Sequence, residues 1–523
     1  MAGTGRCLRC RRLVRSRAVD ELSVTSAHCV GILQPAANTM THRRSILAIL
    51  GVGLLSVPAI AQTPLALVQR AAGAMGGEPA LRALTNTSME FNAALFGIGQ
   101  EETPASPARA TFSFGRIVTD YRGARRVTTQ ESRAVTGVIT RQRRVIAGGI
   151  GMTENNGVAA PDAPGAVDAA VADVRLLPNR LILSALDNPR ALSALAPRRV
   201  RGELMDGVRY ANGPDTVSLW FDRLNGILVS ADRVTDDGVL GDRRNSVLYT
   251  RWADAGGVKL PREIDSEANG RLVQHTVITA ASTNVALDEA LFAIPDSIAR
   301  RAQRSPAAPA PIVVTLAELG PNVWRAEGGS HHSLVVRQGA GLLVVEMPQS
   351  SARSRAVLDT LASRFPRVPV RTAVNTHHHW DHSGGVREYL ASNIPVVTHR
   401  RNVEFVRGIG AATKTVAPDK LSRMKIAPVV RAATDTLAIG TGDSRVEFHE
   451  LPNTHVEGML VAYVPSLRML FVADVIQPGP AMSPVGAREV VAMVRAKGLT
   501  VDRVAGAHAG VVSWADVVAA AAR

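Results

Sequence analysis

The spacing of hydrophobic and polar positions divides the chain into two parts with different predicted structures. Between residues 87 and 295, short stretches of alternating apolar and polar residues recur, as at 110–114, 217–221 and 272–278, and turn residues separate them. Alternation with a period of two is typical of half-buried antiparallel strands. This part is therefore predicted to be a β-rich antiparallel meander, with one mainly helical interruption at 173–186.

Beyond residue 311, the pattern predicts strands that alternate with helices. Strands are predicted at 332–337, 341–346, 369–374, 396–399, 446–452, 469–473 and 501–505, and helices at 351–364, 386–392 and 400–409. This order is typical of an α/β fold. The Pro- and Ala-rich stretch 301–311 cannot form a core. We therefore expect a linker there, between a β-rich domain at 62–300 and an α/β domain at 312–523.

The first 61 residues carry the pattern of an export signal. Residues 1–39 are rich in Arg and lack apolar periodicity, Met40 opens a basic segment, 46–55 is an apolar run, and Ala59-Ile60-Ala61 fits a small-x-small cleavage site. We predict a signal peptide at 40–61, compatible with the twin-arginine route, and a periplasmic or secreted protein. Met40 is then the expected start, and 1–39 a non-native or disordered extension. The alternative is an N-terminal membrane anchor, for which the run is short.

The charge distribution and the positions of the cysteines limit the partners and metal ligands that we expect. The net charge is +15, which by itself suggests nucleic acid or an anionic membrane. However, part of this charge lies in 1–61, which has eight Arg and two acidic residues. The other Arg residues are scattered, with no basic block interleaved with aromatic residues, so we do not expect a nucleic-acid partner. All three cysteines, Cys7, Cys10 and Cys29, precede the predicted cleavage site. The mature chain would therefore have neither disulfides nor thiolate metal ligands.

The strongest chemical signal lies directly after the predicted strand 369–374. Four histidines and one aspartate fall within the six positions 377–382, and Gly384-Gly385 follows. Imidazole and carboxylate groups are ligands for zinc and, with less preference, for iron or manganese. A merely solvated loop is the alternative, but such loops use Ser, Asn, Lys and Glu. The cluster therefore predicts a metal site on a strand-to-helix loop.

The motif His-x-His-x-Asp-His at 377–382 resembles the signature of the metallo-β-lactamase superfamily. The resemblance covers 312–523 and implies an αββα sandwich with one or two metals at one end of its two sheets. It also implies three further ligands, His455, Asp474 and His508, each at or just past the end of a predicted strand. The implied ligand set is His377, His379, Asp381, His382, His455, Asp474 and His508.

These ligands imply two unlike metal positions. His377, His379 and His455 would form a three-histidine position that leaves a coordination site open. Asp381, His382 and His508 would hold a second metal, and Asp474 would bridge the two through its two oxygens. We expect Asp381 and Asp474 to be the catalytic carboxylates, and two Zn²⁺ per chain, with Fe or Mn as alternatives.

For five other residues we expect a structural role or leave two alternatives open. His378 points away from its neighbours in an extended backbone, which predicts packing or support. His331 and His332 either line the rim of the pocket or form an exposed pair. Glu346 stands where the superfamily often has an aspartate, a position that is usually structural. His275, in the middle of a predicted strand, is expected to be a structural histidine.

These observations predict an exported dinuclear zinc hydrolase that attacks an ester, thioester, lactone or similar bond in a small-molecule substrate. One alternative is a β-lactam-hydrolysing metallo-β-lactamase. The other is a periplasmic lipid- or ligand-binding protein with an accessory metal domain, because 252–261 and 287–292 resemble periplasmic lipoprotein-carrier half-barrels. That resemblance implies contact with lipid or a membrane surface through the N-terminal domain. A flavin-linked redox member is disfavoured, because the preceding part is β-rich and has no βαβ pattern.

Overall fold

The computed structural model describes residues 62–523 except 135–136, 214, 305–309, 425–426 and 480–481. The extension at 1–39 and the signal peptide at 40–61 lie outside the described residues and stay predictions. Residues 61–523 form one compact unit. Among the described helices, none is both long and apolar enough to cross a membrane.

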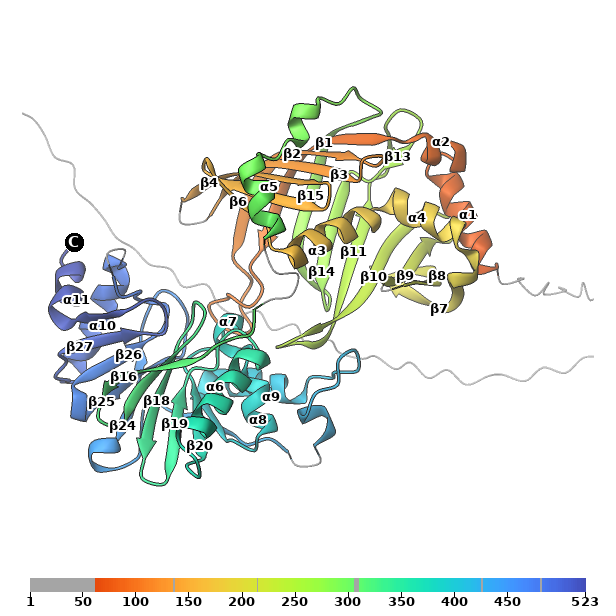
Figure 1. Cartoon of the computed structure of the whole chain (residues 1–523). Coiled ribbons are helices and arrows are strands. Elements are labelled where there is room, and N and C mark those ends of the chain that lie inside the picture. Colours follow the sequence, from red (N-terminus) through yellow and green to blue (C-terminus); the bar gives the residue numbers. More distant parts are fainter. Residues whose placement is uncertain (1–61, 135–136, 214, 305–309, 425–426, 480–481) are drawn as a thin grey trace, which may run out of the picture. The chain divides into compact units, whose positions relative to one another are not determined.

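The N-terminal part is a thirteen-stranded sheet in the order β6-β5-β4-β3-β2-β1-β15-β14-β11-β10-β9-β8-β7, paired antiparallel throughout (Figure 1). Its strands are β1 (Asn86–Phe96), β2 (Ala110–Asp120), β3 (Arg125–Arg133), β4 (Ile139–Ala147), β5 (Ile150–Asn155), β6 (Val158–Pro161), β7 (Leu192–Val200), β8 (Glu203–Asn212), β9 (Asp215–Asp222), β10 (Leu228–Asp237), β11 (Gly241–Thr250), β14 (Glu263–Ala268) and β15 (Arg271–Thr283). A separate short pair is formed by β12 (Ala253–Asp254) and β13 (Lys259–Leu260). The predicted antiparallel β-rich part is confirmed.

The helices of this part are α1 (Pro64–Ala74), α2 (Glu78–Ala83), α3 (Pro164–Arg175), α4 (Pro178–Asp187) and α5 (Asp296–Gln303). Helices α3 and α4 lie on the face of the sheet that carries Ile117 and Arg126, whereas α5 packs on the opposite face, with Val118, Val127 and Val145. Leu181 and Ile182 of α4 pack with Leu219 and Phe221 of β9 in the main core of this part. The mainly helical interruption predicted at 173–186 is confirmed in type but wrong at its start, since helix begins at Pro164. The segment forms two helices, because Pro178 cannot continue α3 and instead begins α4.

The predicted linker at 301–311 is also wrong at its start, since α5 extends to Gln303. Its first turn contains Asp296, whose negative charge stabilises the positive end of the helix dipole. Its last turn contains Arg300 and Arg301, whose positive charges stabilise the negative end. Ile298 is the buried residue of this helix and packs with Phe292. The Pro/Ala stretch therefore begins only after a helix that belongs to the β-rich part.

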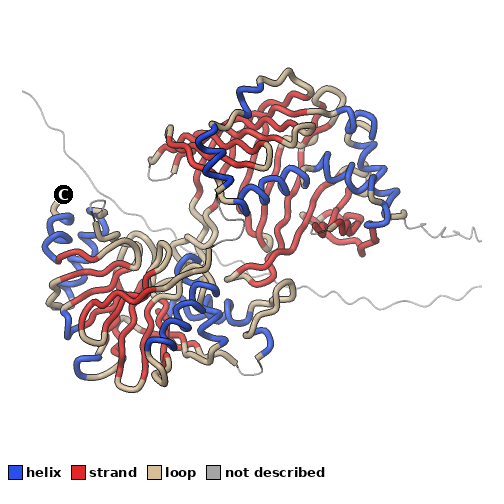
Figure 2. Tube along the Cα trace, viewed as in Figure 1, coloured by secondary structure: helices blue, strands red, loops and turns tan. Residues whose placement is uncertain are grey.

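The C-terminal part contains two sheets with helices on their outer faces (Figures 1 and 2). The seven-stranded sheet contains β16 (Thr315–Gly320), β17 (Val323–Glu327), β18 (Ser333–Gln338), β19 (Gly341–Val345), β20 (Val370–Asn375), β21 (Val396–His399) and β22 (Val430–Ala433), in that order. The six-stranded sheet contains β23 (Thr436–Ile439), β24 (Val446–Leu451), β25 (Met459–Val464), β26 (Met469–Val472), β27 (Arg503–Gly506) and β28 (Val511–Ser513). The helices are α6 (Ser351–Arg364), α7 (Trp380–Ser383), α8 (Val386–Ala391), α9 (Val403–Ala411), α10 (Pro484–Ala496) and α11 (Trp514–Ala521).

The four layers form because successive side chains of a strand point to opposite faces of its sheet. In β19, Leu342 and Val344 pack towards α6 and α8, whereas Leu343 and Val345 pack against the other sheet. In β25, Leu460 and Ala462 face the space between the sheets, and Met459 and Val461 face α10 and α11. Since side chains alternate between the two faces of a strand, fully apolar strands bury both faces. The αββα order predicted for this part is confirmed.

Candidate metal centre

The seven predicted ligands lie in segments that follow four strands of the C-terminal sheets. His377, His379, Asp381 and His382 follow β20, His455 follows β24, Asp474 follows β26 and His508 follows β27. Buried Asn375 closes the first segment, because its Nδ2 donates to the backbone oxygen of His382 (3.2 Å) and to Ser383 Oγ (3.3 Å). Ser383 Oγ in turn donates to the backbone oxygen of His377 (3.2 Å). The turn that presents the ligands is therefore fixed from within.

His377, His379, His455 and Asp474 form the first group, with one donor atom from each lying within 4.8 Å of all the others. The Oδ2 atom of Asp474 lies 3.3 Å from Nε2 of His377, 2.9 Å from Nε2 of His455 and 3.9 Å from Nδ1 of His379. His377 and His379 are fully buried, whereas the side chain of His455 is 30% exposed. This group is therefore reached from solvent on the His455 side.

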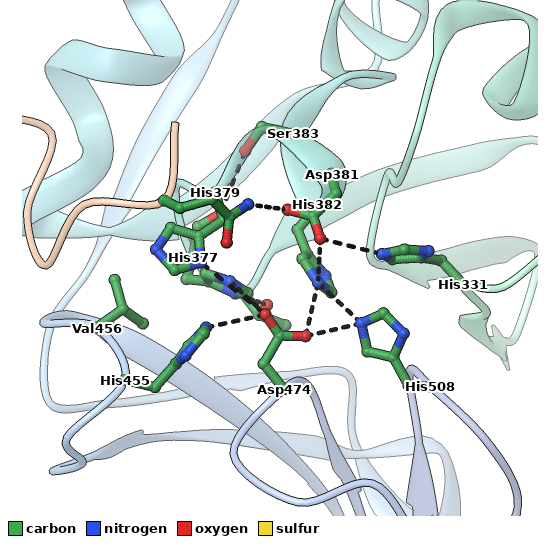
Figure 3. Close-up of polar contacts among 12 residues, drawn as sticks. His331, His377, His379, Asp381, His382, Ser383, His455, Val456, Asp474 and His508 are labelled. Carbon is green, nitrogen blue, oxygen red and sulfur yellow. Dashed lines mark hydrogen bonds and ion pairs between the residues drawn. The ribbon is translucent and has the colours of Figure 1, made fainter. Parts of the chain in front are cut away.

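Asp381, His382 and His508 lie in a second group, and His331 joins them within the same 4.8 Å limit. The Nε2 atoms of His382 and His508 are 3.2 Å apart. They lie 2.7 Å and 2.8 Å from Oδ1 of Asp474. Asp474 therefore faces the first group with one oxygen and the second group with the other, as Figure 3 shows.

The surroundings of the histidines fix which nitrogen is free. His379 Nε2 donates to the backbone oxygen of Glu101 (2.9 Å), and His377 Nδ1 lies 3.0 Å from Thr376 Oγ1. The opposite nitrogens, Nε2 of His377 and Nδ1 of His379, are buried and have no hydrogen-bond partner. A ligand histidine commonly has its other ring nitrogen bonded in this way, which sets the tautomer and the ring orientation.

Glu346 holds His382 in the second group. It is fully buried, its Oε2 accepts from Nδ1 of His382, and its Oε1 accepts from the backbone nitrogen of Thr376 (3.1 Å). Burial opposes protonation of His382, but the carboxylates of Glu346 and Asp474 raise its pKa well above the ordinary value. The glutamate thus takes the structural place in which the superfamily often has an aspartate, and it aims Nε2 of His382 towards Asp474.

The donor set fits divalent metal ions. Burial disfavours the ionised form of Asp474, yet the surrounding imidazoles of His377, His379, His382 and His455 hold the pKa of its carboxyl well below the usual range. Every ion-pair partner of Asp474 among the described residues is an imidazole, with no Lys or Arg. The largely buried carboxylate of Asp474, beside imidazole nitrogens of His377 and His379 that have no hydrogen-bond partner, provides the negative charge and the lone pairs that zinc requires.

A loop of the N-terminal sheet also contacts the centre. It joins β1 to β2, and its segment 97–102 packs against the histidine segment. Besides the Glu101 carbonyl on His379, Gln100 Nε2 donates to Oδ1 of Asp381 (2.7 Å), and the backbone nitrogen of Trp380 donates to the oxygen of Gly99 (3.1 Å). Sequence reasoning missed this loop. It contacts the centre mainly through backbone carbonyl oxygens, which every residue has, so no residue type in the sequence marks these contacts.

Three histidines outside the predicted ligand set lie in different surroundings. His378 is buried between the rings of His379 and Phe405, and burial lowers its pKa to about 3, so it occupies the packing position that its orientation predicted. His331 is buried with Nε2 3.3 Å from Oδ2 of Asp381, and the exposed-pair alternative is therefore wrong for it. Nδ1 of His275 lies 2.6 Å from Oδ1 of Asp265, as expected for a structural histidine.

Two layered sheets with these ligands at one edge define the class of metal-dependent hydrolases. Residues 326–508 match the family model of the metallo-beta-lactamase superfamily. This part of the chain is therefore a metallo-β-lactamase-superfamily domain.

Comparisons with individual proteins extend over limited parts of the chain. The chain is 25% identical over 163 residues to the alpha subunit of 2,4-dinitroanisole O-demethylase from Nocardioides sp. (strain JS1661), covering 30% of this chain and 45% of that subunit. The chain thus spans less than half the length of this relative. Among solved structures, TMB-1 matches with 15% identity and a TM-score of 0.32, over 40% of this chain and 95% of that one. A metallo-beta-lactamase from Pontibacter korlensis matches with 16% identity and a TM-score of 0.32, over 39% and 95%.

Proposed function

We propose that the chain is a dinuclear, zinc-dependent hydrolase of a small-molecule substrate with an ester, thioester, lactone or related bond. The single observation that carries this proposal is Asp474, whose two oxygens face two separate groups of ligand atoms. When bound, zinc lowers the pKa of water towards neutrality and acts as a Lewis acid. Because the sequence lacks cysteine beyond Cys29, a carboxylate stands where a thiolate ligand would otherwise be used.

Other groups of the protein hold the candidate metal ligands in position. Glu346 orients His382, the Glu101 carbonyl orients His379, and Gln100 binds one oxygen of Asp381 while the other faces His331. Such preorganisation matters because small displacements of reacting groups are costly in rate. The partly exposed His455 marks the side from which a substrate would approach.

The test is a panel of chromogenic substrates with and without a chelator. It contains esters, thioesters, lactones and cephalosporins, and also 2,4-dinitroanisole, since the matched relative is named for its O-demethylation. We expect turnover of at least one ester, thioester or lactone, loss of turnover with chelator or in His379→Ala, and recovery of the unmutated protein on adding zinc. A control is His449→Ala, a buried histidine outside all three metal-type groups among the described residues. Turnover that survives complete removal of metal would contradict the proposal.

Export is a further part of the proposal and rests on the residue pattern at 40–61 alone. We expect protein recovered from its native host to begin near Gln62. N-terminal sequencing and cell fractionation test this directly. A cytoplasmic protein that retains residues 1–39 would overturn both the start site and the localisation.

A cavity in the N-terminal part favours a second, compatible function. It has a volume of about 360 Å³ and lies between the sheet and α4. Its walls are mainly apolar, with Met89, Ile117, Leu181, Val247 and Ile278 among the lining residues, and Arg126 and Asp173 at its polar side. This is within the usual size of small-ligand pockets. We propose that the sheet binds an apolar or amphipathic small molecule.

The binding proposal is tested with an apolar fluorescent probe and the full chain. We expect saturable binding that is lost in Ala231→Phe, because Ala231 lines the cavity and a phenyl ring would fill it. The metal content of this variant should equal that of the unmutated chain. Failure of the unmutated chain to bind the probe would contradict a ligand-binding role for the cavity.

A further inference from the structure

We propose that His331 is a fourth protein ligand of the second metal position, alongside Asp381, His382 and His508. The inference rests on the proposed dinuclear centre and extends it. The His-x-His-x-Asp-His resemblance assigns only three residues and the bridging Asp474 to this position. His331 lies fifty residues before Asp381, in the loop between β17 and β18.

The four donor atoms lie close enough together to share one metal ion. Nε2 of His331 lies 3.3 Å from Oδ2 of Asp381, and Nε2 of His508 lies 3.2 Å from Nε2 of His382. All four atoms lie within 4.8 Å of one another. Ligands at ~2.0 Å from a tetrahedral zinc ion are ~3.3 Å apart, so these two separations match the edges of such a site. Figure 3 shows the His331 ring directed at Asp381.

A simple histidine–carboxylate pair explains the arrangement less well. A charge-assisted hydrogen bond between the two groups would measure ~2.7–2.9 Å, shorter than the observed 3.3 Å. The His331 ring also packs edge-on against two other imidazoles, with centroids 4.0 Å from His508 and 5.0 Å from His382. Protonated rings at these separations would repel one another. A metal cation bound between neutral rings would accept a lone pair from each ring nitrogen that points towards it.

His331 is also prepared as a ligand by its surroundings. Its Nδ1 lies 2.9 Å from Ser330 Oγ, which accepts from Gln349 Nε2 at 3.2 Å. With Nδ1 protonated and donating to Ser330, Nε2 keeps its lone pair for a metal.

Fully buried Arg353 on α6 holds the loop that carries His331. It donates to the backbone oxygens of Ala326 (2.9 Å), Gly328 (2.9 Å) and His331 (3.4 Å). Because three carbonyl contacts fix this backbone, the position of His331 is defined before any metal binds.

The extra ligand changes the expected division of labour between the two positions. With His331 bound, the second position would have five protein donors, counting one oxygen of Asp474, whereas the first position has four, three histidines and the other Asp474 oxygen. In a five-coordinate geometry only the first position would therefore keep a coordination site open for substrate, on the His455 side. The second position is then built for tight retention of its metal.

The experiment compares His331→Ala and His331→Gln with the neighbouring His332→Ala in the full chain. Stepwise zinc affinities are measured by competition with a chromophoric chelator, and the coordination number by the visible spectrum of the cobalt(II)-substituted protein. Losing a group that only orients a ligand typically weakens binding 10–100-fold, so we expect the second equivalent to bind at least about 100-fold more weakly in both His331 variants. The first equivalent should be unchanged, and the cobalt spectrum should show the loss of one nitrogen donor.

His332→Ala should bind both equivalents as the unmutated chain does, because its ring is absent from both ligand groups. Unchanged second affinity and an unchanged cobalt spectrum in His331→Gln would overturn the inference and leave His331 as a positioning group for Asp381. An unmutated chain that binds fewer than two metals would instead overturn the dinuclear proposal itself, and the inference with it. The two failures are therefore distinguishable.

Discussion

Asp474 has a φ of +41°, in the left-handed region that residues other than glycine seldom occupy. The backbone nitrogen of Val475 donates to the oxygen of Ala473 at 2.5 Å, so the chain turns tightly directly after β26. Backbone conformations of this kind cost about 1–3 kcal/mol and persist where the surroundings determine them. Here the turn places both carboxylate oxygens among imidazoles, which is the geometry a bridging ligand needs.

Asp474→Asn tests this role at the scale of one residue. The amide keeps the shape but removes a negative charge between two cations, so we expect weaker zinc binding and loss of most activity at low zinc, with partial recovery in excess zinc. Elemental analysis and activity measured against free zinc check this. Asp502→Asn, an exposed aspartate paired with Arg468, is the control. Full occupancy with near-normal turnover in Asp474→Asn would show that the carboxylate does not bridge.

Asp419 provides a pH-dependent test of stability away from the ligands. Partial burial opposes its ionisation, but Arg387 and Ser422 hold the pKa of its carboxyl well below the usual range. Since the folded pKa is lowered, the stabilisation is fully present above about pH 4 and is lost as pH falls through the folded value. Arg387 is buried, and Asp419 is its carboxylate partner.

We therefore expect Asp419→Asn to lower the free energy of unfolding by about 3 kcal/mol at pH 7, because the Arg387 charge stays buried without its partner. The difference from the unmutated chain should shrink as pH is lowered below about 4. Denaturant titrations at several pH values check this. A difference that is constant from neutral pH down to about pH 3 would show that the ion pair is not its source.

At the scale of elements, the β1–β2 loop is the least expected part of the centre. Gly99 has a φ of +85°, and a Cβ atom there would lie 2.3 Å from Cγ and Cδ2 of the Trp380 indole. The loop can therefore approach the histidine segment only with glycine at this position. Buried Glu101 braces the loop, because its carboxylate accepts from the backbone nitrogen of Gly99 (2.7 Å) and pairs with Arg271.

Gly99→Ala should displace this loop and weaken metal binding. The matched control is Gly157→Ala, since Gly157 has a φ of +86° but an added methyl group there would meet no atom within 4 Å. Both substitutions carry the left-handed backbone cost of roughly 1–2 kcal/mol. Only Gly99→Ala should also lower zinc affinity and turnover, by about 10–100-fold as for other lost orienting contacts. Equal effects of both substitutions on zinc affinity would contradict the role of the loop.

The same scale shows which elements the sequence could predict. The runs that became β19 and β26 are largely apolar, because their positions are buried on both faces. Strands β3 and β4 escaped prediction, since both are rich in polar residues and most of their positions are only half-buried. Strands β16 and β17 were missed for a similar reason, as β16 has one buried residue and β17 has two.

At the scale of the whole molecule, the ligand segments were predictable because each follows a recognisable strand. The partners of these ligands were not. Glu101 reaches His379 across 278 positions, and His331 reaches Asp381 across 50. Such pairings arise from tertiary packing. Glu346, at a strand end, and His331, as one of two candidates for the pocket rim, were noted in advance, but their partners were not. Sequence therefore indicated the candidate metal donors, whereas the structure adds the groups that orient them.

The central claim, a dinuclear zinc centre bridged by Asp474, is tested most directly by counting metal. The full chain is stripped with chelator, dialysed and titrated with zinc while bound metal and hydrolysis of the best substrate are followed together. We predict about two zinc ions bound per chain, with hydrolysis restored as they bind. A chain that binds no zinc, even after refolding in its presence, would contradict the account.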